Sequence, residues 1–73
     1  MVKDIDVAAE LSALMIELSK RVDDSIRMVM ETCDREDFEA YRRGAGRVMG
    51  YIFLDVLDPL WRAHPSLKPP GNH

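Results

Sequence analysis

The segment Arg42–Leu60, RRGAGRVMGYIFLDVLDPL, carries three glycines inside a pattern that is otherwise helical. A glycine in a helix interior costs about 1 kcal/mol relative to alanine, so we expect a compensating role for the bare backbone. On a helical wheel Gly46 and Gly50 lie one turn apart on a flank of the apolar side. We therefore expect them to form a flat patch where another helix, most simply from a second subunit, approaches closely.

Around this segment the sequence predicts a helix over residues 35–57 with a polar row and a broad apolar side. The apolar side covers more than half of the circumference, which is more than one neighbouring helix can bury. We expect burial on two sides. The predicted helix-crossing or dimer-interface residues are Gly46, Gly50, Phe53, Leu57 and Trp61.

Upstream, residues 5–32 contain no glycine or proline, and their apolar residues recur at intervals of three and four. This spacing predicts one long amphipathic helix with a single buried face. The predicted buried stripe comprises Val7, Leu11, Leu14, Met15, Leu18, Val22, Ile26, Val29 and Cys33.

The two helices are predicted to meet at a tight turn near residues 32–35. Asp34 is placed as the N-cap of the second helix, Asp37 as a weak capping-box partner, and Cys33 with Phe38 as a hydrophobic staple. One unbroken long helix is the competing interpretation. At the other end, Asp58 and Pro59 have the pattern of an N-cap and a first helical residue, so the main helix is expected to break or kink there.

A short turn over residues 59–64 should then carry Leu60 and Trp61 back onto the helices. The sequence thus predicts an all-α fold: a two-helix antiparallel hairpin with a short C-terminal helical turn, forming one domain over residues 1–64, followed by a flexible tail over residues 65–73.

Chain length and charge favour self-association. Seventy-three residues supply only a few kcal/mol of core stability, so a second copy is the simplest aid. The net charge of −3 is uneven, because residues 1–39 hold eleven acids and five bases, whereas residues 40–73 hold two acids and five bases. Opposite signs suit a chain folded back on itself or two chains packed antiparallel. We expect a homodimer that forms a four-helix bundle.

The sequence offers little for cofactor, metal or membrane binding. The single cysteine, Cys33, excludes an internal disulfide and a cysteine-pair zinc site, and it makes a reduced cytoplasmic setting the default. No apolar run is long enough to span a bilayer, and the N-terminus does not resemble a secretory signal. The acids Asp34, Glu36, Asp37 and Glu39 suit the first turn of a helix and lack a calcium-loop pattern, so no metal or cofactor is expected.

No catalytic residue is assigned. Cys33 lies on the apolar stripe, where a thiol behaves as a small hydrophobe, and His64 is expected at the opposite end of the hairpin. Only an antiparallel dimer would bring the two together, and that alternative stays open. Asp55 belongs to the polar row, where an exposed carboxylate or a surface ion pair is expected.

A cluster of arginines is the strongest positive feature of the second helix. Arg42, Arg43 and Arg47, with Tyr51 one turn further on, could contact an anion or an acidic partner, or pair locally with acids such as Glu39 and Asp55. Nucleic-acid binding is disfavoured by the negative net charge and by the lack of interleaved aromatic residues, and it would require a steep salt dependence.

These observations favour a small non-catalytic helical interaction or regulatory protein that acts as a homodimer and contacts another protein. The alternative is an anion-binding or small-molecule-binding helical bundle, with or without catalysis, that uses the arginine cluster.

Overall fold

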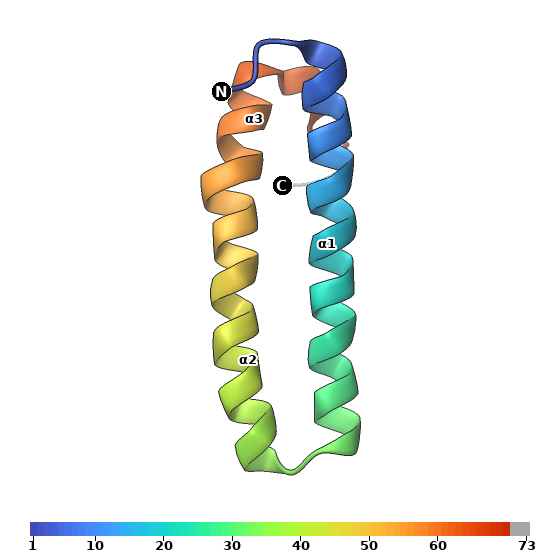
Figure 1. Ribbon diagram of the computed structural model, residues 1–73, viewed down its shortest axis with the longest axis vertical. Helices are drawn as coiled ribbons and strands as arrows, with labels where there is room; N and C mark the ends of the chain where they lie inside the picture. The colour runs from blue at the N-terminus through green and yellow to red at the C-terminus, as the bar shows by residue number, and fades with distance from the viewer. Residues whose placement is uncertain (71–73) are drawn as a thin grey trace.

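A computed structural model describes residues 1–70 and shows two long helices standing side by side (Figure 1). The elements are α1 (Ile5–Thr32), α2 (Arg35–Gly50), the π-helical segment η1 (Tyr51–Leu57), α3 (Asp58–Ala63) and the 3₁₀ turn η2 (Pro65–Leu67). The molecule measures 44 × 22 × 17 Å. The predicted all-α antiparallel hairpin is confirmed, and the alternative of one unbroken helix is wrong.

Aspartate caps set where both long helices begin. The Asp4 carboxylate accepts hydrogen bonds from the backbone N–H groups of Asp6 and Val7, at 2.9 and 3.1 Å. At the hairpin turn the Asp34 carboxylate accepts from the N–H of Asp37 at 2.8 Å, as the sequence predicted. Each carboxylate satisfies donors that a first helical turn leaves unpaired and also interacts favourably with the helix dipole.

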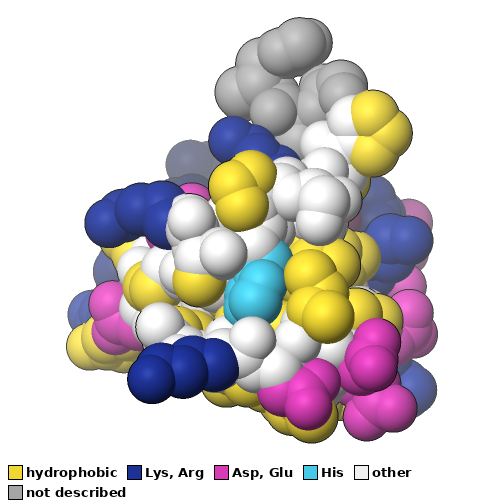
Figure 2. All heavy atoms as spheres, turned by 90° about the horizontal axis from the view of Figure 1, so that it is seen from above, with side chains coloured by type: hydrophobic (Ala, Val, Ile, Leu, Met, Phe, Trp, Pro, Cys, Tyr) yellow, Lys and Arg dark blue, Asp and Glu magenta, His cyan; other side chains and the backbone are white. Residues whose placement is uncertain are grey.

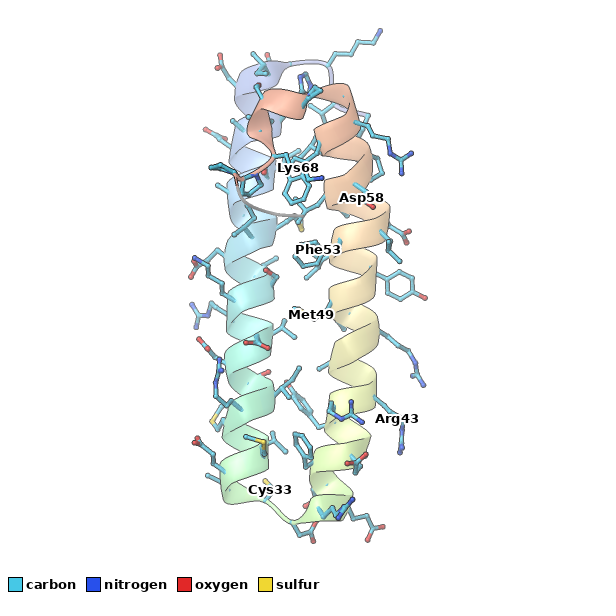
Figure 3. All side chains as sticks on the ribbon, turned by 180° about the vertical axis from the view of Figure 1, so that it is seen from behind. Cys33, Arg43, Met49, Phe53, Asp58 and Lys68 are labelled. Carbon is cyan, nitrogen blue, oxygen red and sulfur yellow. The ribbon has the colours of Figure 1, made fainter. Side chains whose placement is uncertain are left out.

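The predicted packing of Cys33 is wrong, because this residue is exposed at the turn (Figure 3). Cys33 ends α1 in an extended conformation, with φ −115° and ψ 169°. Extended backbone at this position turns its side chain out of the helical stripe that predicted its burial.

The predicted break at Asp58 is also wrong, because the helix continues through Pro59. Asp58 has helical dihedrals of φ −58° and ψ −51°, and its N–H donates to the carbonyl of Phe53, five residues back. An α-helix would set the proline ring against the carbonyl four residues earlier, that of Asp55, and would leave that carbonyl without its donor. The wider turn of η1 rearranges the hydrogen bonds in the segment just before the proline, so that the chain continues as a helix.

The wide turn also decides which side chains face α1. At 100° per residue, an uninterrupted α-helix would place Trp61 about 160° away from Ala45, the buried residue of α2. A π-helical insertion turns the following residues back by about 100°. Leu57, Leu60 and Trp61 are accordingly all buried.

The best-packed part of the core lies at the end of the hairpin away from the turn. Ile52, Leu57 and Trp61 form its centre, and Phe53 meets Trp61 edge-on with ring centroids 6.4 Å apart. Met15 and Ile16 of α1 and Leu67 of η2 pack against this cluster. The predicted return of Leu60 and Trp61 onto the helices is therefore confirmed.

Two polar contacts close this end of the molecule. The Trp61 indole Nε1–H donates to the hydroxyl of the buried Ser12 at 3.0 Å. The His64 Nε2–H donates to the backbone carbonyl of Val2 at 2.6 Å, and Figure 2 shows the imidazole near the centre of the end face. Part of the tail predicted to be flexible, Pro65–Leu67, forms η2, and residues 71–73 of that tail lie outside the described part.

The buried hydrogen bond between Trp61 and Ser12 gives a test of this packing. Ser12→Ala leaves the indole N–H without a partner in a dry site, and we expect a loss of about 1–3 kcal/mol of unfolding free energy, measured by urea denaturation. Trp61→Phe in the Ser12→Ala background should cost less than Trp61→Phe alone, because the hydrogen bond is already absent. Strictly additive losses would contradict the coupling.

Candidate interaction surface

Small side chains of α1, rather than its large apolar ones, lie closest to the second helix. Ala8, Ser12 and Ser19 are the buried residues of α1. Val7, Leu14 and Leu18 keep 45, 50 and 40% of their surface exposed. The predicted buried face is thus rotated, because small residues allow the helices to approach and move the larger ones to the flank. One side of α1 carries an apolar stripe that the chain itself leaves uncovered.

The second helix continues this uncovered surface. Tyr41 and Val48 are both more than 40% exposed, and between them Gly44 leaves the backbone bare. Together with α1 they bound an apolar groove of about 440 Å³, lined by Val22, Ala40, Tyr41, Gly44, Ala45 and Val48. The Tyr41 hydroxyl shares a hydrogen bond of 2.7 Å with the Ser25 hydroxyl at one edge of this groove.

The groove and the exposed residues of α1 form one surface. Leu18 and Leu14 precede Val22 by four and eight residues, so they continue from the groove along the same side of α1. We call this surface the apolar face; it consists of Val7, Leu14, Leu18, Val22, Tyr41, Gly44 and Val48. A contiguous apolar surface of this length is typical of a protein interaction site.

The five residues predicted for a helix crossing or dimer interface fall in different places. Leu57 and Trp61 are buried inside the chain, and Phe53 packs against them. Gly46 and Gly50 face open space, since a Cβ built on either residue would have no neighbour within 4 Å. Within residues 1–70 no other helix therefore approaches Gly46 or Gly50, and their contact with a second subunit stays a prediction. The glycine that borders the groove is Gly44, which the wheel argument had left aside.

The three arginines of the predicted cluster divide into one that is paired and two that are not. Arg42 lies 3.4 Å from the Glu39 carboxylate. Arg43 points away from α1 (Figure 3), and neither Arg43 nor Arg47 forms an ion pair within residues 1–70. Tyr51, one turn beyond Arg47, is 65% exposed. Arg42 of the predicted cluster is thus paired with its neighbour Glu39. Arg43 and Arg47 form a short basic strip on the outer side of α2.

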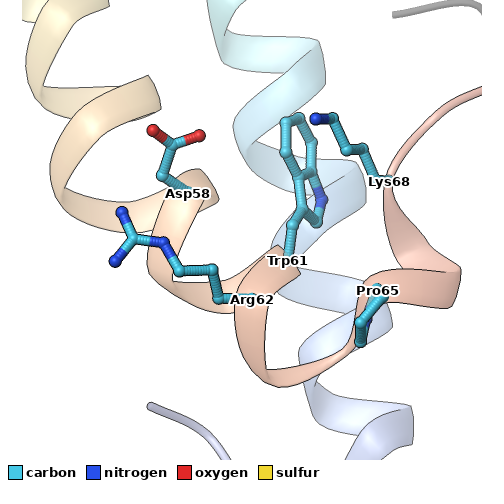
Figure 4. A pocket seen from close by; sticks show the side chains of 5 residues that line it. All are labelled: Asp58, Trp61, Arg62, Pro65 and Lys68. Atoms are coloured by element: carbon cyan, nitrogen blue, oxygen red, sulfur yellow. The ribbon is translucent and has the colours of Figure 1, made fainter.

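A second depression lies beside the C-terminal core and combines opposite charges (Figure 4). Asp58 and Arg62 stand one turn apart on α3, and Trp61, Pro65 and Lys68 complete the lining. The carboxylate of Asp58 lies beside the cations of Arg62 and Lys68, so it weakens the positive potential that would attract an anion. The sequence had given Asp58 only a capping role.

Other polar groups are either paired locally or far apart. Arg27 binds both Asp24 and Asp23, at 3.0 and 3.1 Å, and these carboxylates raise the pKa of Arg27. Cys33 at the turn and His64 at the far end cannot meet within one chain. Residues 1–70 contain no group of three side chains suited to hold a metal ion. None of the helices described is both long and apolar enough to cross a membrane.

Comparison with known proteins gives no further guide, because no protein-family model, curated protein or solved structure matches the chain.

The open surroundings of Gly46 lead to a testable expectation. Gly46→Ala adds a methyl group that meets no neighbour, so the gain in helix propensity should stabilise the chain by about 0.5–1 kcal/mol. For a domain of this size that gain corresponds to a rise in melting temperature of roughly 2–8 °C, measurable by circular dichroism. A lower melting temperature, or loss of association, would instead place Gly46 against another helix.

Proposed function

We propose that this protein is a non-catalytic interaction or regulatory protein that acts as a homodimer, in which two hairpins pack through their apolar faces into a four-helix bundle. The observation that carries the proposal is the apolar face itself, which runs along α1 and across to α2 and is bordered by a groove of about 440 Å³.

The dimensions of the chain support self-association. A compact monomer of 8.3 kDa exposes about 4,600 Å² by the usual scaling of area with mass, whereas this chain exposes 5474 Å². Its radius of gyration is 14.5 Å, against about 11 Å for a compact chain of the same length. The excess area of roughly 900 Å² is close to the ~800 Å² per partner that a standard protein interface buries.

The core of a single chain is small, so burying the apolar face in a dimer would add to the stability of the protein. Within residues 1–70 the buried apolar side chains are Ala8, Ala45, Ile52, Leu57, Leu60 and Trp61. A chain of this length commonly needs oligomerisation, metals or disulfides for full stability. Covering the apolar face with a second copy would extend the core from the C-terminal end towards the hairpin turn.

In this proposal the dimer presents its outer surfaces to another protein. Arg43 points away from α1 (Figure 3), and Arg47 follows it one turn later on the same side of α2, so the basic strip lies on the outer side of that helix. It suits contact with an acidic surface, while the reduced Cys33 suits a cytoplasmic setting.

The decisive experiment is the molar mass in solution, measured by light scattering behind gel filtration. The wild-type chain should elute at twice its 8.3 kDa mass and persist as a dimer on dilution. Leu18→Glu should give a helical monomer, because it places a charge in the apolar face. Leu54→Glu is the matched control, since Leu54 is 67% exposed and lies outside the apolar face; it should leave the dimer intact. A wild-type monomer at all concentrations would overturn the proposal.

A second candidate function is anion or small-molecule binding by the arginines of α2. It is favoured by the absence of an ion pair at Arg43 or Arg47 within residues 1–70, and by the exposed Tyr51 beside them. Guanidinium groups one turn apart can hold a phosphate or carboxylate through several charge-assisted hydrogen bonds.

This candidate predicts that inorganic phosphate or citrate raises the melting temperature. Arg47→Ala should abolish the rise, whereas Arg62→Ala, at the far end of the molecule, should retain it. An equal response in all three chains would mean a general salt effect and would exclude the site.

A further inference from the structure

The exposed residues Val7, Leu14 and Leu18 lie on a stripe of α1, otherwise half-buried, whose spacing is symmetric about one residue. Counted from Val7, the intervals along this stripe are 4, 3, 4, 4, 3 and 4, with Leu18 at the middle. The positions are Val7, Leu11, Leu14, Leu18, Val22, Ser25 and Val29. Eleven-residue spacing keeps such a stripe nearly parallel to the helix axis, because 11 residues complete about three turns. A twofold axis across α1 at Leu18 would superpose the stripe on its own reverse.

The same axis would pair large apolar side chains across the contact. Leu14 lies four residues before Leu18, and Val22 lies four residues after it. In an antiparallel pair of α1 helices, Leu14 of one copy would therefore lie level with Val22 of the other. Leu14 is half exposed in the single chain, and this pairing would cover it.

Charges beside the stripe follow the same symmetry. Glu17 and Arg21 border Leu18, and neither forms an ion pair within residues 1–70, although Arg27 and Arg42 do. An antiparallel arrangement about Leu18 sets Glu17 of one copy beside Arg21 of the other, twice. In a parallel twofold pair the flanks that carry Glu17 and Arg21 would lie on opposite sides of the contact, so these charges would not meet.

We infer that the occupant of the apolar face is a second copy of this chain, packed antiparallel along α1 with the twofold axis at Leu18 and with Leu14 of each copy level with Val22 of the other. This inference rests on the proposed dimer and specifies its geometry. It places the two hairpin turns at opposite ends of the assembly.

Cysteine cross-linking tests the geometry directly. In a Cys33→Ser background, Leu18→Cys should give a covalent dimer with a short bis-maleimide linker, because the two Cβ atoms face each other across the axis. The wild-type chain should not cross-link through Cys33, since the two thiols would lie about 45 Å apart, 30 residues of helix rise. Leu54→Cys in the Cys33→Ser background is the matched control for random collision, and it should stay monomeric on a denaturing gel.

A charge exchange gives an independent readout. The Glu17→Arg chain has arginine at both positions 17 and 21, and the Arg21→Glu chain has glutamate at both. Like charges would therefore meet across the axis in a dimer of either variant. Each variant alone should associate several-fold more weakly than the wild type. An equimolar mixture should recover the dimer as a heterodimer, detectable by native mass spectrometry. Circular dichroism of each variant checks that the helices persist.

The outcomes separate this inference from the proposed function. Cross-linking at position 18 together with recovery in the mixture supports the antiparallel geometry. Two outcomes would keep the proposed function and overturn this geometry. One is a dimer that cross-links through Cys33 but not at position 18, and the other is a mixture that forms no more heterodimer than homodimers. A monomer at every concentration overturns both.

Discussion

Pro59 and the wide helical turn before it are the constraint on which the rest of the structure depends. Proline has no N–H to donate, and in an α-helix its ring would press against the carbonyl of Asp55. The chain meets this constraint with a π-helical segment, Tyr51–Leu57, rather than with a break. The rotation that this segment introduces then directs Leu57, Leu60 and Trp61 towards the inside of the hairpin, where all three are buried. The hairpin is closed at this end because of that rotation.

The C-terminal core, which closes one end of the hairpin, is also the reason why the apolar face is uncovered. Burying Trp61 and Leu57 within the chain builds a core around Ile52, and the contact of Trp61 with Ser12 holds α1 in one rotational setting. With that setting, the small residues of α1 lie against the second helix and its leucines lie on the flank. The apolar face is therefore the consequence of how the C-terminal core orients α1. A substitution in that core should change association as well as stability.

Self-association along the apolar face would complement this arrangement. The single-chain core occupies the C-terminal end, while the groove lies nearer the hairpin turn, between Val22 and Val48. A second copy placed there would extend apolar packing to the part of the hairpin in which a single chain buries few side chains. The basic strip of α2 would stay on the outside, where a partner of opposite charge could reach it.

The sequence by itself determined the local features. Two amphipathic segments, the aspartate cap of the second helix and the burial of Leu60 and Trp61 could be predicted, because periodicity and capping depend on residues within a few turns of one another. The bounds of the first long helix and the start of the second followed from the same signals. Arg42, paired with Glu39, was open to prediction for the same reason, as a contact between neighbouring turns.

Only the tertiary structure decided which faces those segments present. A wheel drawn at 100° per residue assumes an unbroken α-helix, so it assigned Gly46, Gly50, Leu57 and Trp61 to one continuous interface. The π-helical segment shifts the phase after Gly50, which separates the buried Leu57 and Trp61 from the open glycines. Likewise, nothing in the composition of α1 indicated that Ser12 and Ser19 would face inward in place of Leu14 and Leu18. The rotation of a helix is set by the side chains it meets, and these come from residues 16 to 49 positions away in the chain.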